Sequence, residues 1–253
     1  MPDKITISAV IITLNEEHNI SRCLKSLKWV DEIIIIDSGS TDKTCDIAKK
    51  FSSKVKIFHN PWPGDGLQKC FGIEKTSHPW VIIIDADEEV TPELAKNIKN
   101  AIKSASENSC YKIKRSAYFL GKKIKHGDWG RDWIIRVFPK KTFNWSPNKF
   151  HSGLMAYKNE AFDLKGELLH HTQDSIHQAL NKINDYSTGS ADMLIKKGKK
   201  SNLLKAILKS KWTFFRAYII RLGFLDGKVG YVIAKNAEIH TYYKQLKLVY
   251  KNK

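Results

Sequence analysis

The stretch "DEIIIIDSGSTDKTCDIAKKF", residues 31–51, contains two hydrophobic patterns in succession. A run of isoleucine over residues 33–36 ends at Asp37, and such a run is typical of a strand buried on both faces. A Ser/Gly/Thr turn follows, after which Ile47, Ala48 and Phe51 recur at helical spacing. The stretch therefore predicts a strand, a polar turn and an amphipathic helix.

The same plan occurs on both sides of this stretch. "ISAVIITLNEE", residues 7–17, predicts a strand over 7–13, and "EEHNISRCLKSLKW", residues 16–29, then has apolar residues at helical spacing. "VKIFHN", residues 55–60, predicts a short strand, and "WVIIIDADEE", residues 80–89, predicts another. Thr91-Pro92 is then a start signal for a further helix. Apolar strands that alternate with amphipathic helices predict an α/β fold, with a mostly parallel sheet covered by helices on both faces.

Polar residues follow the predicted strands where each one ends, namely Thr13, Asn15, Asp37, Asp85 and Asp87. Ligands of open parallel sheets bind beyond the carboxyl ends of the strands. The Asp-x-Asp turn at 85–87 could hold a divalent cation, because Mg²⁺ takes one or two carboxylates together with substrate phosphates. Such a turn also arises by chance, so its place after a buried strand is what favours a metal site.

The composition indicates a folded protein that is strongly basic. Hydrophobic residues make up 42% of the 253-residue chain, and the formal net charge is +17. From Ala191 onward, 15 Lys and Arg against three acids give +12. Such a tail attracts phosphates on nucleic acid or on anionic lipid. The scattered cysteines, and the lack of a signal-peptide pattern or a long apolar run, lead us to expect reduced thiols and a cytosolic location.

The pattern changes twice along the chain. From about residue 111 it becomes rich in aromatic residues and predicts β-strands with loops, whereas residues 175–198 and 203–222 predict helices. We therefore expect an α/β domain over 1–172, made of one half over 1–108 and another over 109–172. A basic helical C-terminal extension over 173–253 would follow.

Three N-terminal segments together resemble the family-2 glycosyltransferases of the GT-A fold: "SAVIITLNEEHNISRCLKSL", "VDEIIIIDSGSTDKTCDIA" and "WVIIIDADEEVTPEL". Two later segments are similar to the lipopolysaccharide core β-1,4-glucosyltransferase-like branch of that family: "KGELLHHTQDSIHQALNKINDYSTGSADML" and "RLGFLDGKVGY". The resemblance covers nearly the whole chain. It implies that 1–172 is a GT-A catalytic domain, with a nucleotide-sugar-binding half over 1–108 and an acceptor-side half over 109–172. It implies an inverting enzyme that moves a hexose, with glucose the expected sugar, from a UDP-sugar to a lipopolysaccharide-core or related surface-glycan acceptor.

The resemblance also implies roles for particular residues. Those of the nucleotide-sugar site are Thr13, Leu14, Asn15, Glu16, Asp37, Lys69, Asp85 and Ala86. Asp37 would accept from the base, and Lys69 would balance diphosphate charge. A divalent cation, Mg²⁺ or Mn²⁺, would be held by Asp87 with Asp85, and His170 would be a third ligand or a packed histidine. Metal and lysine together would stabilise the charge on the departing diphosphate.

The catalytic base is where the chain departs from the branch. A His-Glu pair is usual in the segment that here reads "FHSGL", but His151 is followed by Ser152. A carboxylate or imidazole must take the proton of the acceptor hydroxyl. Asp132 in "GDWGRDWIIRVF" is the first candidate, with Asp128 and His151 as alternatives. A structural role for Asp132 would be to pair with a neighbouring arginine.

The segment "LLKAILKSKWTFFRAYIIRL", residues 203–222, has one apolar stripe with cations largely off it. It could pack on the catalytic domain or lie in an anionic membrane interface, as a glycolipid acceptor would require. The expected location is thus the cytoplasmic face of the inner membrane, as a peripheral protein.

Two other functions compete with glycosyl transfer. A nucleotidyltransferase shares the α/β plan but usually has a glycine-rich basic loop after its first strand, and "TLNEEHNIS" is not such a loop. A nucleic-acid-binding protein would explain the charge, but the cations accompany aliphatic residues and no nucleic-acid motif is present. We therefore expect no nucleic-acid partner.

Overall fold

The computed structural model describes residues 5–106, 108–142 and 161–251. The chain forms two compact units. The first comprises Met1–Arg115 and Trp133–His170, and the second comprises Ser116–Asp132 and His171–Lys253. The boundaries between the units along the chain fall within β6, after Arg115, and within β9, after His170, as well as at the start of β8.

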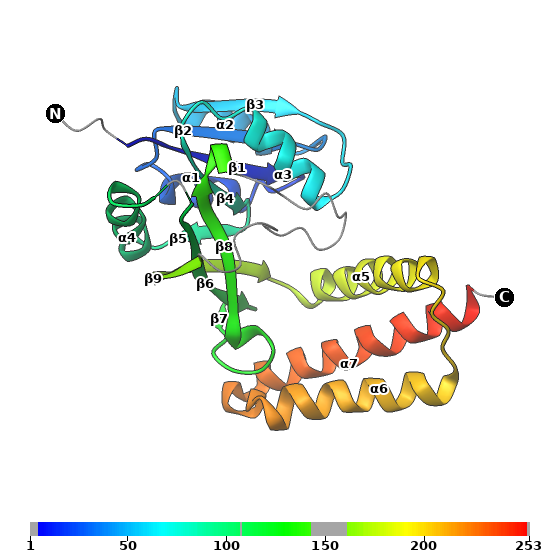
Figure 1. Ribbon diagram of the computed structural model, residues 1–253. Helices are drawn as coiled ribbons and strands as arrows, with labels where there is room; N and C mark the ends of the chain where they lie inside the picture. Colours follow the sequence, from blue (N-terminus) through cyan, green and yellow to red (C-terminus); the bar gives the residue numbers. More distant parts are fainter. Residues whose placement is uncertain (1–4, 107, 143–160, 252–253) are drawn as a thin grey trace. The chain divides into compact units, whose positions relative to one another are not determined.

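The first unit is built on a sheet whose strand order is β3-β2-β1-β4-β8-β6-β9-β5 (Figure 1). Its elements are β1 (Ile7–Thr13), α1 (Ile20–Ser26), β2 (Glu32–Asp37), α2 (Thr44–Phe51), β3 (Val55–His59), α3 (Asp65–Glu74), β4 (Trp80–Asp85), β5 (Glu88–Val90), α4 (Pro92–Lys103), β6 (Cys110–Phe119), β8 (Asp132–Pro139), η2 (Lys140–Thr142) and β9 (Ala161–Gln173). Strand β1 pairs in parallel with β2 and β4, and β2 with β3. Strands β8 and β9 join β4 and β5 in antiparallel fashion. The predicted α/β sheet is confirmed, and its parallel part is the segment that the sequence identified.

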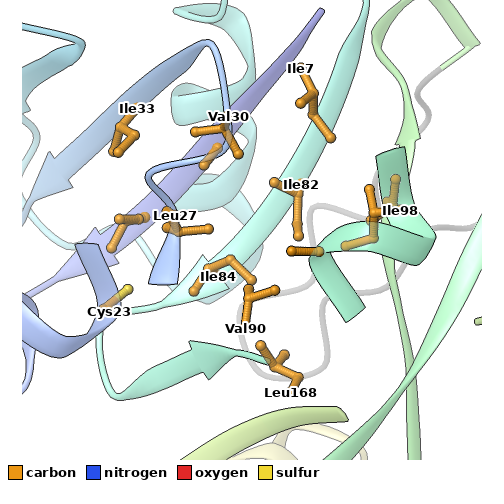
Figure 2. Packing of buried hydrophobic residues seen from close by; sticks show 14 of the residues in the cluster. Ile7, Cys23, Leu27, Val30, Ile33, Ile82, Ile84, Val90, Ile98 and Leu168 are labelled. Atoms are coloured by element: carbon orange, nitrogen blue, oxygen red, sulfur yellow. The ribbon is translucent and has the colours of Figure 1, made fainter. Parts of the chain in front are cut away.

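The apolar strands contribute side chains to two separate hydrophobic cores, because successive side chains of a strand point to opposite faces of the sheet. In β1, Ala9 and Ile11 belong to one cluster with α1 and α4, and Val10 belongs to the other with Ile73 of α3. Figure 2 shows the first cluster, in which Ile82 and Ile84 of β4 lie near Ile98 of α4. Burial on both faces explains why these strands are apolar throughout instead of alternating.

Helix α4 begins where the sequence predicts. The Thr91 side chain caps it by accepting from the Leu94 amide at 3.3 Å, and Pro92 is its first residue. The Thr91 hydroxyl also donates to the Glu167 carbonyl of β9 at 2.9 Å. Gly166 allows this approach: its φ is +97°, and a Cβ there would lie 2.5 Å from the Leu94 nitrogen. The helix start is thereby fixed to the strand that carries His170.

The second unit is helical, with α7 packed against both α5 and α6 (Figure 1). Its elements are β7 (Lys122–Lys123), η1 (Trp129–Arg131), α5 (Ile176–Lys196), α6 (Leu203–Phe215), the π-helical η3 (Arg216–Ile220), η4 (Gly223–Asp226) and α7 (Gly227–Tyr250). The helices expected over 175–198 and 203–222 are present as α5 and as α6 with η3. A Cβ on Gly230 would lie 1.9 Å from the Gly223 carbonyl oxygen, so this glycine pair allows η4 to pack on the first turn of α7.

Residues 116–132 are grouped with the C-terminal helices in the second unit. The catalytic domain expected over 1–172 and the extension expected over 173–253 stay predictions. Asp226 explains the grouping, because its carboxylate accepts from the Lys125 and His126 amides at 3.2 and 2.8 Å. Asp128 adds ion pairs with Arg216, at 2.9 Å, and with Arg221.

The sequence leads us to expect reduced cysteines, and it contains no apolar run long enough to cross a membrane. None of the four cysteines, which all lie in the described part of the chain, forms a disulfide. Within residues 5–106, 108–142 and 161–251, no helix is both long and apolar enough to span a bilayer.

Candidate active site

The polar residues predicted at the strand ends share one edge of the sheet. Thr13 of β1 is opposite Asp37 of β2, and Ile12 is opposite Asp85 of β4. Three adjacent parallel strands therefore place a hydroxyl and two carboxylates side by side beyond their carboxyl ends. This is the position at which open α/β sheets bind ligands.

The loop after β1 is fastened to the loop after β2. Asn15 has a left-handed φ of 54°, and its side chain accepts from the Thr41 amide at 2.8 Å. The Asn15 amide donates to Ser40 Oγ at 2.9 Å, and the Glu16 amide donates to Thr44 Oγ1 at 2.7 Å. Leu14, which precedes Asn15, is 49% exposed. These contacts hold two of the predicted nucleoside-binding segments in one rigid edge.

Asp37 organises the second of these loops. Its buried carboxylate accepts from the Gly39 and Ser40 amides and from Ser40 Oγ at 2.5–3.2 Å. Burial alone would raise the pKa of Asp37, but the hydrogen bonds from Ser40 and Gly39 lower it below its ordinary value. His59 Nδ1 lies 3.6 Å away. Asp37 is therefore an ionised anchor of the loop, and its predicted contact with a nucleotide base stays a prediction.

Asp85 takes part in a buried charge cluster. Its Oδ2 accepts from Arg136 Nη2 at 2.8 Å, and its Oδ1 lies 3.4 Å from Lys69 Nζ. Arg136 also donates to Glu88 Oε1 at 3.0 Å, and Glu88 Oε2 accepts from the Asp85 amide at 2.9 Å. Lys69 is held from the other side by Asp65 at 2.8 Å. The acidic turn is thus folded around one buried arginine.

The pKa values within this cluster follow from its charges. Burial opposes ionisation of Asp85, yet Arg136 and Lys69 hold its pKa far below the ordinary value. The same carboxylates, Asp85 and Glu88, outweigh burial at Arg136 and raise the pKa of its guanidinium. Asp85 is therefore an anion, and Lys69 a cation held in place, at the edge of the sheet.

Asp87 is positioned differently. Its Oδ2 lies 3.3 Å from Nε2 of His170, with exposed fractions of 14% and 18% for the two side chains. The pairing of β5 with β9 puts Glu88 opposite His170, which brings the histidine to the acidic turn. Of the two aspartates in the turn, Asp85 faces arginine and Asp87 faces histidine.

This donor set fits a divalent cation that also binds phosphate. In the described part of the chain no three His, Cys, Asp or Glu side chains form a complete metal cage. A cation that shares substrate phosphates needs only one or two protein ligands, and Asp87 with His170 can supply them. Two buried oxygens at the same edge, Thr13 Oγ1 and Asp85 Oδ1, have no hydrogen-bond partner in the structure. Buried polar atoms normally have partners, so the Thr13 hydroxyl can meet a ligand, whereas Asp85 Oδ1 has only its ion pair with Lys69 at 3.4 Å.

The remaining predicted site residues fall in three places. Ala86 is buried within the acidic turn. Asp132 is the first residue of β8, where the chain passes from the second unit to the first. His151 lies outside the described residues. Arg136, a conceivable partner of Asp132, is held by Asp85 and Glu88.

Sequence reasoning missed the roles of Arg136 and Glu88. Both side chains are almost completely buried, at 6% and 0% exposed. A signal was present, because Arg136 interrupts the apolar run "WIIRVF", and a charged residue in a buried strand requires a partner. Which carboxylate it would meet depends on the antiparallel pairing of β8 with β4.

The fold and the acidic edge define a GT-A glycosyltransferase, an enzyme that uses a parallel α/β core to bind its sugar donor. The family described as "Glycosyl transferase family 2" matches residues 8–164. The chain belongs to this family. That assignment decides against the nucleotidyltransferase alternative.

Two relatives extend the likeness beyond the family core. The chain is 34% identical over 237 residues to a glycosyltransferase of Rickettsia typhi, which covers 89% of this chain and 80% of the relative. It is 28% identical over 252 residues to the lipopolysaccharide core biosynthesis glycosyltransferase LpsC of Rhizobium meliloti. This match covers 98% of this chain and 93% of LpsC. The second unit is therefore part of what the relatives share.

A solved structure supports the fold over the same length. TarS of S. aureus, residues 1–349 in complex with UDP-GlcNAc, superposes with a TM-score of 0.51 at 14% identity. The match covers 96% of this chain and 91% of that chain. The likeness is one of fold.

Proposed function

We propose that the chain catalyses the inverting transfer of a hexose from a UDP-sugar to a lipopolysaccharide-core or related surface-glycan acceptor. The observation that carries the proposal is the edge where Asp85, Asp87 and His170 meet the loops fastened by Asn15 and Asp37. The similarity to LpsC along almost the full chain supports the acceptor class. Glucose is the sugar that the resemblance of the C-terminal segments favours.

On the donor side, the residues present can bind and orient a nucleoside diphosphate. The edge offers the unpartnered hydroxyl of Thr13 to polar groups of the nucleoside. Lys69, held between Asp65 and Asp85, is placed to attract the diphosphate without moving. A cation that is preorganised in this way stabilises charge on a leaving group without reorganisation at the moment of reaction.

The cofactor we propose is Mg²⁺ or Mn²⁺, held by Asp87 and His170 on the protein side. When bound, such a cation stabilises the negative charge of the departing diphosphate as a Lewis acid. Asp85 is committed to Arg136, so its contribution is to fix the turn that presents Asp87. Its Oδ1 lies 3.4 Å from Lys69 Nζ and accepts no hydrogen bond, so it can also meet a ligand hydroxyl or the cation.

On the acceptor side, a carboxylate must accept the proton of the attacking hydroxyl. We assign this role to Asp132, with His151 as the alternative. If the acceptor is anchored in a lipid, the enzyme works as a peripheral protein on the cytoplasmic face of the inner membrane.

Donor and metal binding can be tested by thermal unfolding with UDP-, GDP- and CDP-sugars, with and without Mn²⁺ or Mg²⁺. A ligand that binds only the folded state raises the melting temperature by mass action. We expect UDP with metal to raise it, and Asp87→Ala to abolish the rise. The matched control is Asp46→Ala, which removes an exposed carboxylate of α2 and should leave the rise intact. An undiminished rise in Asp87→Ala would remove Asp87 from the metal site.

The assignment of the catalytic base can be tested by measuring the kcat of variants. Asp132→Asn should keep donor binding but lower kcat by about 10²–10⁴-fold, the usual effect of losing a general base. His151→Ala serves as the comparison. Normal turnover of Asp132→Asn together with a collapse in His151→Ala would transfer the role to His151.

A further inference from the structure

A groove of about 480 Å³ lies between α6 and α7, entirely within the second unit. Lys209, Thr213 and Arg216 line it from the α6 side, and Thr241, Lys244 and Gln245 line it from α7. The two helices run side by side along the whole of α6 (Figure 1). The groove is not part of the edge at Asp85 and Asp87.

The charge in this groove is uncompensated. In the described part of the second unit, neither Lys209 nor Lys244 forms an ion pair. Glu238, the acid of α7, is occupied by Lys211 and Lys235 at 2.8 and 2.9 Å. Burial and the nearby Lys209 lower the pKa of Lys244. Two like charges held together in a partly buried groove are unfavourable unless an anion joins them.

The single acid of the groove does not neutralise these lysines. Asp128 lies at one end, and its two oxygens face Arg216 and Arg221. His240, which also lines the groove, has its pKa lowered by burial and by Lys244, so its ring is neutral at pH 7 and adds no charge of either sign. The net sign of the groove is therefore positive.

The polar groups around the lysines are mainly donors. Arg216 Nε is buried without a hydrogen-bond partner in the described structure. Ser201 donates to Gln245 Oε1 at 2.7 Å, which leaves the amide nitrogen of Gln245 for another acceptor. Thr213 Oγ1 donates to the Lys209 carbonyl at 2.8 Å and, at 3.3 Å, to Thr241 Oγ1, so the Thr241 hydroxyl is an acceptor in this contact and keeps its own proton for another partner. Lysines and donors converging in this way suit a phosphate group.

An exposed apolar surface borders the groove, and Trp212 belongs to both. We call it the α6 face. Its members are all at least 41% exposed: Leu203, Leu204, Ile207, Leu208, Trp212, Phe215, Ile219, Ile220, Leu222, Phe224 and Leu225. Patches of this kind on a folded unit mark an interaction surface. Lys205, Lys209 and Lys211 on the same helix favour an anionic bilayer over a neutral one.

We propose that the α6/α7 groove binds a phosphate group carried by a lipid, while the α6 face enters the interface of the membrane that contains this lipid. The groove and the α6 face would contact the same lipid, because Trp212 both lines the groove and belongs to the apolar surface. The inference does not depend on the proposed function, since binding to lipid needs neither donor nor turnover.

Flotation of the full chain with vesicles tests the proposal. The vesicles are phosphatidylcholine alone or phosphatidylcholine with one-fifth phosphatidic acid. We expect binding to the phosphatidic acid vesicles, and a loss of at least tenfold in affinity in the double variant Lys209→Gln, Lys244→Gln. The matched control is Lys199→Gln, Lys200→Gln, which removes the same charge from an exposed loop and should cost less than threefold.

Thermal unfolding with inorganic phosphate distinguishes the contribution of the groove to binding from that of the α6 face. Phosphate should raise the melting temperature of the parent and of Leu208→Ser, but not that of Lys209→Gln, Lys244→Gln. Leu208→Ser should nevertheless float less. Without phosphate, the double lysine variant should melt at or above the parent temperature, because its like-charge repulsion is gone. A purely structural role for the lysines predicts a lower melting temperature.

Three results would overturn the inference. Equal flotation of the parent and the double lysine variant would show that the groove does not bind the lipid. If inorganic phosphate stabilises the protein but phosphatidic acid vesicles do not bind, the ligand of the groove is a soluble phosphate compound and not a lipid. Binding to a single-stranded oligonucleotide that exceeds vesicle binding and is lost in the double lysine variant would assign the groove to nucleic acid.

Discussion

Arg136 determines how the acidic turn can work. A buried arginine is unfavourable unless its guanidinium meets carboxylates, and it meets Asp85 at 2.8 Å and Glu88 at 3.0 Å. With these two acids occupied, Asp87 is the aspartate of the turn that lies beside His170. One arginine therefore neutralises two of the four carboxylates in this short segment, and it gives the two aspartates different surroundings.

Replacing this arginine should be costly for folding. Arg136→Met keeps much of the volume but leaves Asp85 and Glu88 buried without their shared partner. We expect the free energy of unfolding in urea to fall by about 3–5 kcal/mol, the usual effect of removing one member of a buried ion pair. The control is Lys251→Ala, whose pair with Asp192 is exposed and should contribute at most about 1 kcal/mol. A loss below about 1 kcal/mol in Arg136→Met would mean that Arg115 or water replaces the guanidinium.

At the scale of elements, the sequence was most informative where a segment is buried on both sides. The strands at 7–13, 33–36 and 81–84 could be recognised because residues on either face must be apolar, whichever helix covers them. Their order along the chain also sets the shared edge of Thr13, Asp37 and Asp85, so this part of the site was predictable. The contact of His170 with Asp87 was proposed only from the resemblance.

The rest depended on pairing between distant segments. The partner of Arg136 follows from the register of β8 against β4, which no local pattern encodes. Helix α7 lacks a simple apolar stripe, since it packs against both α5 and α6 and so buries residues on more than one side. The placement of residues 116–132 with the C-terminal helices follows from Asp128 and Asp226, whose partners lie about 90–100 residues away.

Helix α3, which carries Lys69, packs on the sheet through Gly72. A Cβ at this position would lie 2.4 Å from Val10 Cγ1 and 3.0 Å from Ile36 Cγ1. Gly72→Ala should therefore lower the free energy of unfolding by about 1–3 kcal/mol, because the added methyl overpacks a fully buried contact. Denaturation by urea measures the loss.

A double-mutant cycle checks the cause. Val10→Ala removes the nearest atoms, so the combined variant should lose less than the sum of the two single losses by at least about 0.5 kcal/mol. Simple additivity would show that the helix moves away from the sheet instead of meeting Val10.

For the molecule as a whole, acid should be destabilising for two separable reasons. The chain has a formal charge of +17 before its 9 histidines are protonated, so self-repulsion grows as the pH falls. In addition, hydrogen bonds and ion pairs lower the pKa values of several folded-state carboxylates, among them Glu32, Asp37 and Asp85. Salt screens the first effect much more than the second, because Glu32 and Asp37 are buried.

Glu32 isolates the second effect. Burial opposes its ionisation, but Lys56 at 2.8 Å, Ser8 at 2.6 Å and Ser77 at 2.8 and 2.9 Å lower its pKa from 4.5 to about 2. A carboxylate with a lowered folded-state pKa stabilises the protein fully above pH 4.5, and this contribution is lost as the pH falls toward about 2. The shift corresponds to at most about 3 kcal/mol.

Glu32→Gln cannot ionise, so its disadvantage relative to the parent should shrink by up to about 3 kcal/mol between pH 6 and pH 2. Urea denaturation of both proteins across this range, at low salt and again at high salt, measures the difference. The narrowing should persist at high salt, because the interactions of Glu32 are buried, whereas the overall acid destabilisation of each protein should weaken. A difference that stays constant with pH would show that Glu32 has an ordinary pKa in the folded protein. A narrowing that disappears in high salt would assign it to surface repulsion.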